Sequence, residues 1–168
     1  MQTLIIFAHT FWADSKVNKA LLKEVENIPT ITIHNLTTTY PQGNIDIQKE
    51  IELLQKPEKI IFQFPLFWYS TPSLMKEWED RVLISILDGN TPRLLKGKKF
   101  QVITTTGAKE SSYDGHHGYT INALLAPIHN TFSYMGCEIL LPCCMYEASV
   151  ENLEVEYYLS CIQRGRTI

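Results

Sequence analysis

Residues 3–8 read Thr-Leu-Ile-Ile-Phe-Ala, a short apolar run rich in β-branched and aromatic side chains at the start of the chain. A run without polar alternation is typical of a strand that is covered on both faces, as in a parallel sheet. Two later segments, 60–64 and 100–105, have the same character. We therefore predict that residues 3–8 form the central strand of a parallel sheet.

Strands and helices alternate along the rest of the chain. The predicted strands are 3–8, 30–34, 60–64, 100–105 and 138–141, the last of them ended by Pro142. The predicted helices are 15–27 with Ser15 as N-cap, 46–55, 73–87, 120–135 with a bend at Pro127, and 149–163. This alternation predicts an α/β fold with a doubly wound, five-stranded parallel sheet of order 2-1-3-4-5.

Composition limits the classes of protein to which the chain can belong. The 168 residues suit one domain, and 45% hydrophobic residues are enough for a packed core. A formal net charge of -3 disfavours nucleic acid as the main partner. No apolar stretch approaches the ~20 residues of a membrane-spanning helix, and residues 1–10 show no leader pattern. We expect one cytoplasmic domain over residues 1–168, with four cysteines as reduced core thiols.

Ligands of doubly wound sheets bind beyond the carboxyl ends of the strands, where the strand order reverses. This rule selects the loops 9–18, 65–71 and 105–119. The first loop leads into a helix N-terminus, where free backbone N–H groups and the helix dipole attract a phosphate. Ser15 and Asn18 add hydrogen-bond donors there. The alternative is that Ser15 only caps the helix and that His9 is an ordinary loop histidine.

The second loop, Pro65-Leu66-Phe67-Trp68-Tyr69-Ser70-Thr71-Pro72, sets three consecutive aromatic residues between two prolines. So short a connection cannot turn all three toward a core, so we expect a rigid apolar wall. Such a wall suits the edge of a flat heteroaromatic ring such as a flavin. The alternative is a packed interface patch, and the two readings are compatible.

The third loop begins with the hydroxyl-rich turn 104–108, in which a glycine lets the backbone approach a ligand closely. Farther along lie Tyr113, His116 and His117. Adjacent histidines are poor joint ligands for one ion, and no carboxylate or cysteine set accompanies them. We therefore expect no metal site.

These loops and their surroundings resemble one family. The segment from Gln63 to Pro72, followed by Lys76, Trp78 and Asp80, carries most of the resemblance. Further matching positions are Ala8, His9, Ser15, Asn18, Tyr40, Pro41, Ile45, Asp46, Ile47, Gly97, Lys98, Thr105, Thr106, Gly107, Gly118, Tyr119, Leu125, Pro127 and Pro142. Together they resemble the flavodoxin-like NAD(P)H:quinone oxidoreductases. The bacterial branch, with the ancillary flavoproteins of glutathione-gated potassium efflux systems, is most similar.

The resemblance implies a flavodoxin-like fold and FMN as the cofactor. The residues implied near its phosphate are His9, Ser15, Lys16, Val17 and Asn18. Those implied to hold its ring are Pro65, Leu66, Phe67, Trp68, Tyr69, Thr105, Thr106, Gly107 and Ala108. Position 108 departs from the family, which usually has a second glycine there, so the Ala108 methyl group would crowd the ring edge.

The resemblance also implies an activity and partners. NADH or NADPH would supply two electrons, and a quinone or a similar electrophile would accept them, both binding in turn over the same flavin face. Tyr113 and His117 are implied to assist charge or proton movement. A homodimer with active sites at its interface is implied as well. A noncatalytic or dual-role regulatory subunit of a potassium efflux system, peripherally associated with a membrane transport protein, is the alternative function.

Overall fold

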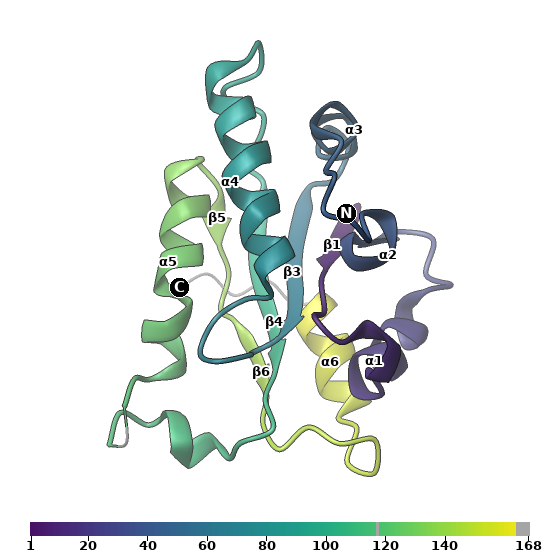
Figure 1. Cartoon of the computed structure of the whole chain (residues 1–168), viewed down its shortest axis with the longest axis vertical. Helices are drawn as coiled ribbons and strands as arrows, with labels where there is room; N and C mark the ends of the chain where they lie inside the picture. The colour runs from purple at the N-terminus through teal and green to yellow at the C-terminus, as the bar shows by residue number, and fades with distance from the viewer. Residues whose placement is uncertain (117, 164–168) are drawn as a thin grey trace.

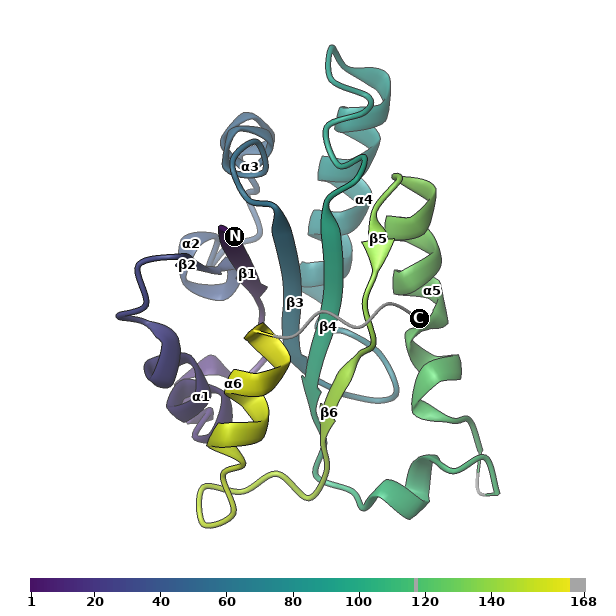
Figure 2. The same cartoon turned by 180° about the vertical axis from the view of Figure 1, so that it is seen from behind.

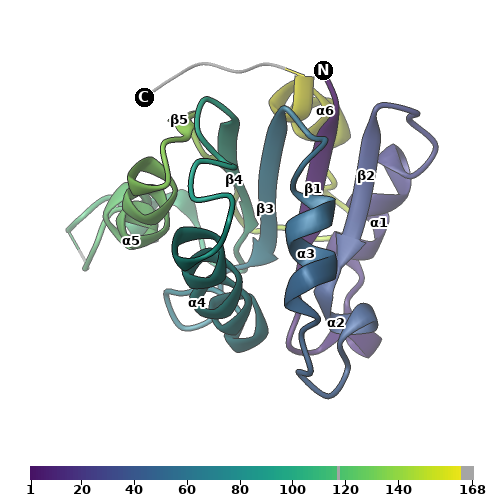
Figure 3. The ribbon, with the colours of Figure 1, turned by 90° about the horizontal axis from the view of Figure 1, so that it is seen from above.

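A central parallel sheet organises the chain, of which the computed structural model describes residues 1–116 and 118–163. Strand β1 (Thr3–Phe7) is completely buried and lies between β2 (Ile31–Asn35) and β3 (Lys59–Pro65). Strand β4 (Lys99–Thr105) pairs with β3 in parallel. The strand order β2-β1-β3-β4-β5 confirms the predicted order 2-1-3-4-5. Figure 1 shows β1, β3, β4 and β5 in this sequence, and Figure 3 shows β2 on the other side of β1.

Helices cover both faces of this sheet, as Figures 2 and 3 show from behind and from above. One face carries α1 (Val17–Val25) and α6 (Val155–Gln163), which pack on Ile5, Phe7 and Ile61. The other face carries α2 (Leu36–Thr39), α3 (Ile47–Leu53), α4 (Ser73–Asp88) and α5 (Ile121–Tyr134). Because side chains alternate along each strand, one apolar run supplies both cores.

The fifth strand is divided, which the sequence prediction of one strand at 138–141 missed. Strand β5 (Glu138–Ile139) and strand β6 (Cys143–Met145) both pair with β4. Lys99 faces Glu138, but Ile103 faces Cys143, so the edge strand holds one extra residue between the two parts. Such an extra residue is a bulge, and Pro142 lies within it because proline has no N–H to donate. The side-chain Nε2 of Gln101 donates to the Leu141 carbonyl, at 2.9 Å.

Several predicted boundaries were wrong near loops. Helix α1 has Lys16 as its N-cap and begins at Val17, so Ser15 is not the cap. The residues before it form a 3-10 turn, η1 (Trp12–Asp14), which keeps the chain from entering the α-helix at Ser15. Helix α6 begins at Val155 instead of residue 149. A second 3-10 turn, η2 (Glu110–Tyr113), lies in a segment that was predicted as a loop, and the short α2 lies in a segment for which no element was predicted.

The cysteine prediction was wrong for one pair. A disulfide joins Cys143 of β6 to Cys161 of α6, whose Cα atoms are 6.3 Å apart. The sequence could not show this pairing, because it arises when α6 packs back across the sheet beside the resumed edge strand. Cys137 and Cys144 are free thiols.

Among the residues that the structure describes, no helix is long and apolar enough to cross a membrane. Over residues 1–116 and 118–163, no three His, Cys, Asp or Glu side chains gather in a way that could hold a metal ion.

A buried carboxylate fixes α3 to the sheet and to α4. Glu50 is 1% exposed. It accepts hydrogen bonds from Tyr40 at 2.5 Å, from Trp78 at 2.6 Å and from His34 at 2.8 Å. Burial raises the pKa of Glu50, but these hydrogen bonds together lower it more, and the net result lies below the ordinary value.

We predict that Glu50→Gln lowers the free energy of unfolding by about 2–3 kcal/mol near neutral pH, because an amide cannot accept all three hydrogen bonds. Since the folded pKa is depressed, the carboxylate's contribution is complete above the unfolded pKa of about 4.3 and is lost as pH falls below it. Urea unfolding at several pH values measures this. Glu52→Gln, on the exposed side of the same helix, is the control. Equal effects of the two substitutions would contradict the prediction.

Candidate functional site

A cavity of about 330 Å³ lies at the carboxyl edge of the sheet, beyond β1, β3 and β4. All three loops selected from the sequence contribute to it. Its lining consists of His9, Phe11, Asp14, Ser15, Lys16, Val17, Asn18, Pro65, Leu66, Phe67, Thr105, Thr106, Gly107 and Ala148. The parallel strand pairing therefore brings residues as distant in the sequence as His9 and Ala148 to one site.

The N-terminus of α1 opens into this cavity. Its first N–H groups have no partner within the helix, and the side chain of the N-cap residue Lys16 makes no capping hydrogen bond. Ser15 is buried, and its Oγ has no hydrogen-bond partner among the described residues. Asn18 is also buried but is held by its neighbours: its Nδ2 donates to Thr105 Oγ1 at 3.0 Å. This end of the cavity suits an anion, because it offers free donors and the positive end of a helix dipole.

His9 follows β1 in a fixed orientation. Its backbone N–H donates to Thr37 Oγ1 at 2.9 Å, and its Nδ1 accepts from the N–H of Phe11 at 3.0 Å. Burial, and to a lesser degree the ammonium of Lys19, lowers the pKa of His9, so the ring is neutral at pH 7. With Nδ1 accepting, the proton of the neutral ring lies on Nε2. His9 thus provides a neutral N–H donor.

The aromatic loop forms a tight turn. Phe67 and Ser70 exchange two backbone hydrogen bonds of 3.0–3.1 Å, with Trp68 and Tyr69 between them. Both central residues have positive φ, 46° for Trp68 and 65° for Tyr69. Such values are uncommon for bulky residues, and strained backbone of this kind gathers at functional sites. The turn directs Phe67 toward the cavity and leaves the Trp68 side chain 93% exposed.

Phe67 is the centre of an aromatic cluster that the turn creates. Its ring makes edge-on contacts with His9, at 5.5 Å between ring centroids, and with Phe11, at 5.8 Å. Such contacts stabilise the wall of the cavity without filling its interior.

The turn after β4 forms the opposite side. Its backbone pairs with the segment after β6: Thr106 donates to the Met145 carbonyl, and Ala148 donates to the Thr106 carbonyl, both at 2.9 Å. A Cβ atom added at Gly107 would meet no atom of the described residues within 4 Å. The protein's own packing therefore does not require glycine here, and the backbone is open to close approach by a ligand.

The structure brings most of the predicted binding residues to the cavity but not all of them. Trp68, Tyr69 and Ala108 are outside its lining. Tyr113 ends η2, half-buried, with its ring 5.8 Å from that of Tyr146. His117 lies outside the described residues.

Three lining residues were missed. Phe11 and Asp14 belong to a predicted loop, where their aromatic and carboxylate side chains were a usable signal. Nothing in the sequence around Ala148 indicated a place in the site. Its position depends on β6, which pairs with β4 beyond Pro142.

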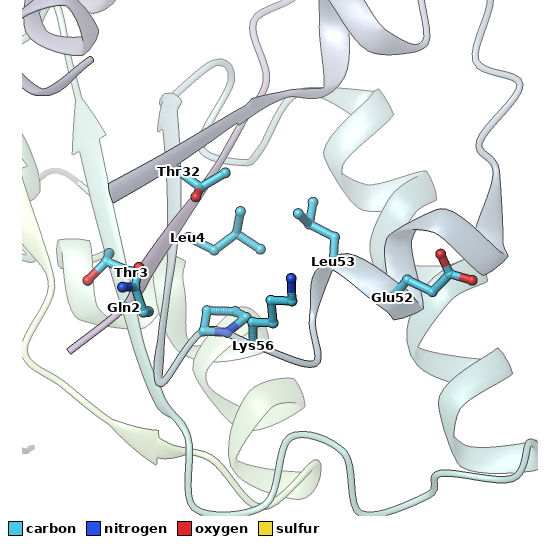
Figure 4. A pocket seen from close by; sticks show the side chains of 8 residues that line it. Gln2, Thr3, Leu4, Thr32, Glu52, Leu53 and Lys56 are labelled. Carbon is cyan, nitrogen blue, oxygen red and sulfur yellow. The ribbon is translucent and has the colours of Figure 1, made fainter. Parts of the chain in front are cut away.

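A second cavity, of about 370 Å³, lies between the start of β1, β2 and the end of α3. Figure 4 shows Leu4, Leu53 and Lys56 among its lining side chains. It is at the amino edge of the sheet, opposite the predicted loops. Because ligands of this architecture bind at the carboxyl edge, the first cavity is the candidate site.

Fold and site together define a class: a doubly wound α/β protein with an anion-binding helix terminus and an aromatic wall at one sheet edge. The chain belongs to a family with the flavodoxin-like fold, whose model matches residues 1–157.

Individual relatives are similar over most of their length. The uncharacterized NAD(P)H oxidoreductase YrkL of Bacillus subtilis is 39% identical over 83% of this chain and 82% of its own. The glutathione-regulated potassium-efflux system ancillary protein KefG of Cronobacter sakazakii is 37% identical over 90% and 84%. General stress protein 14 of Treponema denticola, solved in complex with FMN, superimposes with a TM-score of 0.88 at 31% identity, over 97% and 98% of the two chains.

The two buried polar residues at α1 should respond differently to truncation. Without added ligand, we predict that Asn18→Ala lowers the free energy of unfolding by about 1–2 kcal/mol, because buried partners lose their hydrogen bonds. Ser15→Ala should change it by less than about 0.5 kcal/mol, since the hydroxyl has no partner to lose. Urea unfolding of both variants measures the difference. If Ser15→Ala is as costly as Asn18→Ala, the hydroxyl has a structural role instead.

Proposed function

We propose that the protein is an FMN-dependent oxidoreductase that transfers two electrons from NADH or NADPH to a quinone or a related electrophile. The observation that carries the proposal is the cavity that joins an uncapped helix N-terminus to an aromatic wall. The family membership, the FMN-bound relative and the oxidoreductase relative support it.

The residues present fit the phosphate end of FMN. The unpartnered Ser15 hydroxyl is a buried polar group that a phosphate oxygen would satisfy. The backbone N–H groups at residues 17 and 18 would donate to the same anion. Lys16 is exposed at the rim, where its ammonium adds positive charge.

The residues at the other end fit a flat ring. Pro65, Leu66 and Phe67 supply an apolar surface on one side. The open position at Gly107 allows the backbone of 105–108 to reach the ring edge, where its N–H groups would hydrogen-bond to ring heteroatoms. These contacts would favour the negative charge that a flavin gains on reduction.

FMN, when bound, supplies the two-electron chemistry, so the protein's own residues position the reactants and stabilise charge. Neutral His9 would donate from Nε2 at the cavity wall. Tyr113 and His117, in the loop after β4, remain the proposed side chains for assisting proton movement. The exposed Trp68 would extend the wall beyond the cavity, toward the nicotinamide and the electron acceptor.

A regulatory role is the second candidate. Relatives with the KefG name are ancillary proteins of potassium efflux systems, and one matches 90% of this chain. The exposed Trp68-Tyr69 turn offers an apolar surface beside the site for such a partner. Under this proposal the protein acts in the cytoplasm and docks peripherally on a membrane transport protein. Pull-down from membranes with wild-type and catalytically inactive protein would separate docking from turnover.

We predict that purified protein binds FMN noncovalently and is yellow when loaded. Ser15→Ala should weaken FMN binding about tenfold, because it removes a charge-assisted hydrogen bond to the phosphate. Fluorescence titration of FMN measures this, and Ser112→Ala on the exposed η2 turn is the matched control. A folded protein that takes up no FMN rules out the proposed function.

We further predict that FMN-loaded protein oxidises NADH or NADPH when benzoquinone or menadione is present. Tyr113→Phe and His117→Ala should each lower kcat, because each removes a group that moves charge or protons. Steady-state kinetics under anaerobic conditions measure this. Absence of turnover with both nucleotides would exclude the proposed oxidoreductase activity. Unchanged turnover in both variants would exclude only the proposed roles of Tyr113 and His117.

A homodimer is the third part of the proposal. Trp68 and Tyr69 are exposed at the aromatic turn, and α4 exposes Ile84 and Leu87 on its outer side. Exposed apolar side chains such as the adjacent Trp68 and Tyr69 are typical of association sites. We therefore expect a symmetric dimer in sedimentation velocity runs of FMN-loaded protein at micromolar concentration, and a monomer there would contradict it.

A further inference from the structure

Four buried side chains form a continuous hydrogen-bonded chain that ends at the cavity. Tyr158 on α6 donates from its hydroxyl to Gln63 Oε1 on β3, at 2.8 Å. Gln63 Nε2 donates to Asn18 Oδ1 at 3.4 Å, and Asn18 Nδ2 donates to Thr105 Oγ1 at 3.0 Å. All four residues are at most 5% exposed. This series of hydrogen bonds therefore links α6 to Asn18 and Thr105, two residues that line the candidate site.

The donors and acceptors in this series of hydrogen bonds all point one way, and Tyr158, the first donor, determines that direction. A buried hydroxyl must donate its proton to an acceptor, and Gln63 Oε1 is the acceptor that Tyr158 meets. Burial raises the pKa of Tyr158, so the hydroxyl stays protonated over the physiological range. With its oxygen bound by Tyr158, Gln63 turns its NH₂ group toward Asn18.

The donor-to-acceptor pattern continues from Gln63 to the cavity. Asn18 accepts through its oxygen and so presents its NH₂ group to Thr105. Thr105 Oγ1 accepts this bond, which leaves the hydroxyl hydrogen of Thr105 free to donate. Thr105 lines the cavity, so the chain ends in a donor available to a ligand.

Tyr158 is held firmly enough to impose this direction. About one helical turn beyond it, the buried Lys59 ammonium donates to the carbonyls of Ile162, at 2.9 Å, and Cys161, at 3.3 Å. The disulfide to Cys143 fixes the same turn of α6 to the edge strand. Tyr158 itself is outside the cavity lining, so it can act on a ligand only through other residues.

We propose that Tyr158 is a positioning residue for the ligand site: acting through Gln63, it orients the Asn18 amide and thereby presents the Thr105 hydroxyl as a donor to the flavin. This inference rests on the proposed binding of FMN. It gives α6, which contributes no lining residue, a role in cofactor affinity.

The test is a double-mutant cycle on FMN affinity, measured by fluorescence titration. Tyr158→Phe removes only the hydroxyl and should weaken FMN binding about tenfold, because Gln63 and Asn18 are no longer held in one orientation. In a Thr105→Val background the same substitution should change affinity less than about twofold, since the donor it presents is already gone. Tyr157→Phe, on the exposed side of the same helix, is the matched control and should leave affinity unchanged.

A merely structural role for Tyr158 gives a different result. It predicts equal losses of FMN affinity in the wild-type and Thr105→Val backgrounds, and that outcome, like an unchanged affinity of Tyr158→Phe, overturns the inference. If Tyr158→Phe does not fold, the double variant Tyr158→Phe/Gln63→Leu removes donor and acceptor together and should fold. Its FMN affinity should still be about tenfold weaker, and wild-type affinity there overturns the inference.

The failure of this inference and that of the proposed function are distinguishable. If wild-type protein binds FMN and the variants bind it equally well, only the role of Tyr158 is wrong. If folded wild-type protein binds no FMN, the proposed function is wrong and the inference is overturned with it.

Discussion

Parallel pairing of β1 with its two neighbours is the constraint on which the rest of the molecule depends. Parallel strands cannot be joined by tight turns, so each connection crosses one face of the sheet as a helix. The loops that follow β1, β3 and β4 must then all begin at the same edge of the sheet. A helix N-terminus, an aromatic turn and a hydroxyl-rich turn meet there because the topology leaves them no other place. The site is a consequence of strand order before any side chain is considered.

The elements that were predicted well are those with strong local signals. The buried apolar runs of β1, β3 and β4 and the amphipathic pattern of α4 agree with the structure within one or two residues. The divided edge strand was missed because Pro142 reads as an end, although here it occupies a bulge and pairing resumes beyond it. The partner of Cys161 depends on that resumption, so a local reading of the sequence could not identify it.

In the candidate site, too, local sequence patterns predicted some features, whereas features that depend on contacts between distant residues were missed. Loop composition indicated most of the lining, because aromatic residues, hydroxyls and a helix start are visible in the sequence. The roles of individual residues were not visible. Ser15 resembles a helix cap, yet it lies between a 3-10 turn and α1, and its hydroxyl has no partner among the described residues. Gln63 resembles an ordinary polar residue within a strand, yet it connects α6 to the cavity through side chains that are 95 and 45 residues away along the chain.

We propose above all that the N-terminus of α1 holds the phosphate of a flavin mononucleotide whose ring lies on the aromatic turn. Riboflavin has the same ring without the phosphate, so calorimetric titration of the apo protein with FMN and with riboflavin tests the claim most directly. We predict one FMN bound per chain and an affinity for riboflavin at least ~100-fold lower, in line with the loss of several charge-assisted hydrogen bonds. Equal affinities for the two flavins, or no binding of either by folded protein, would contradict it.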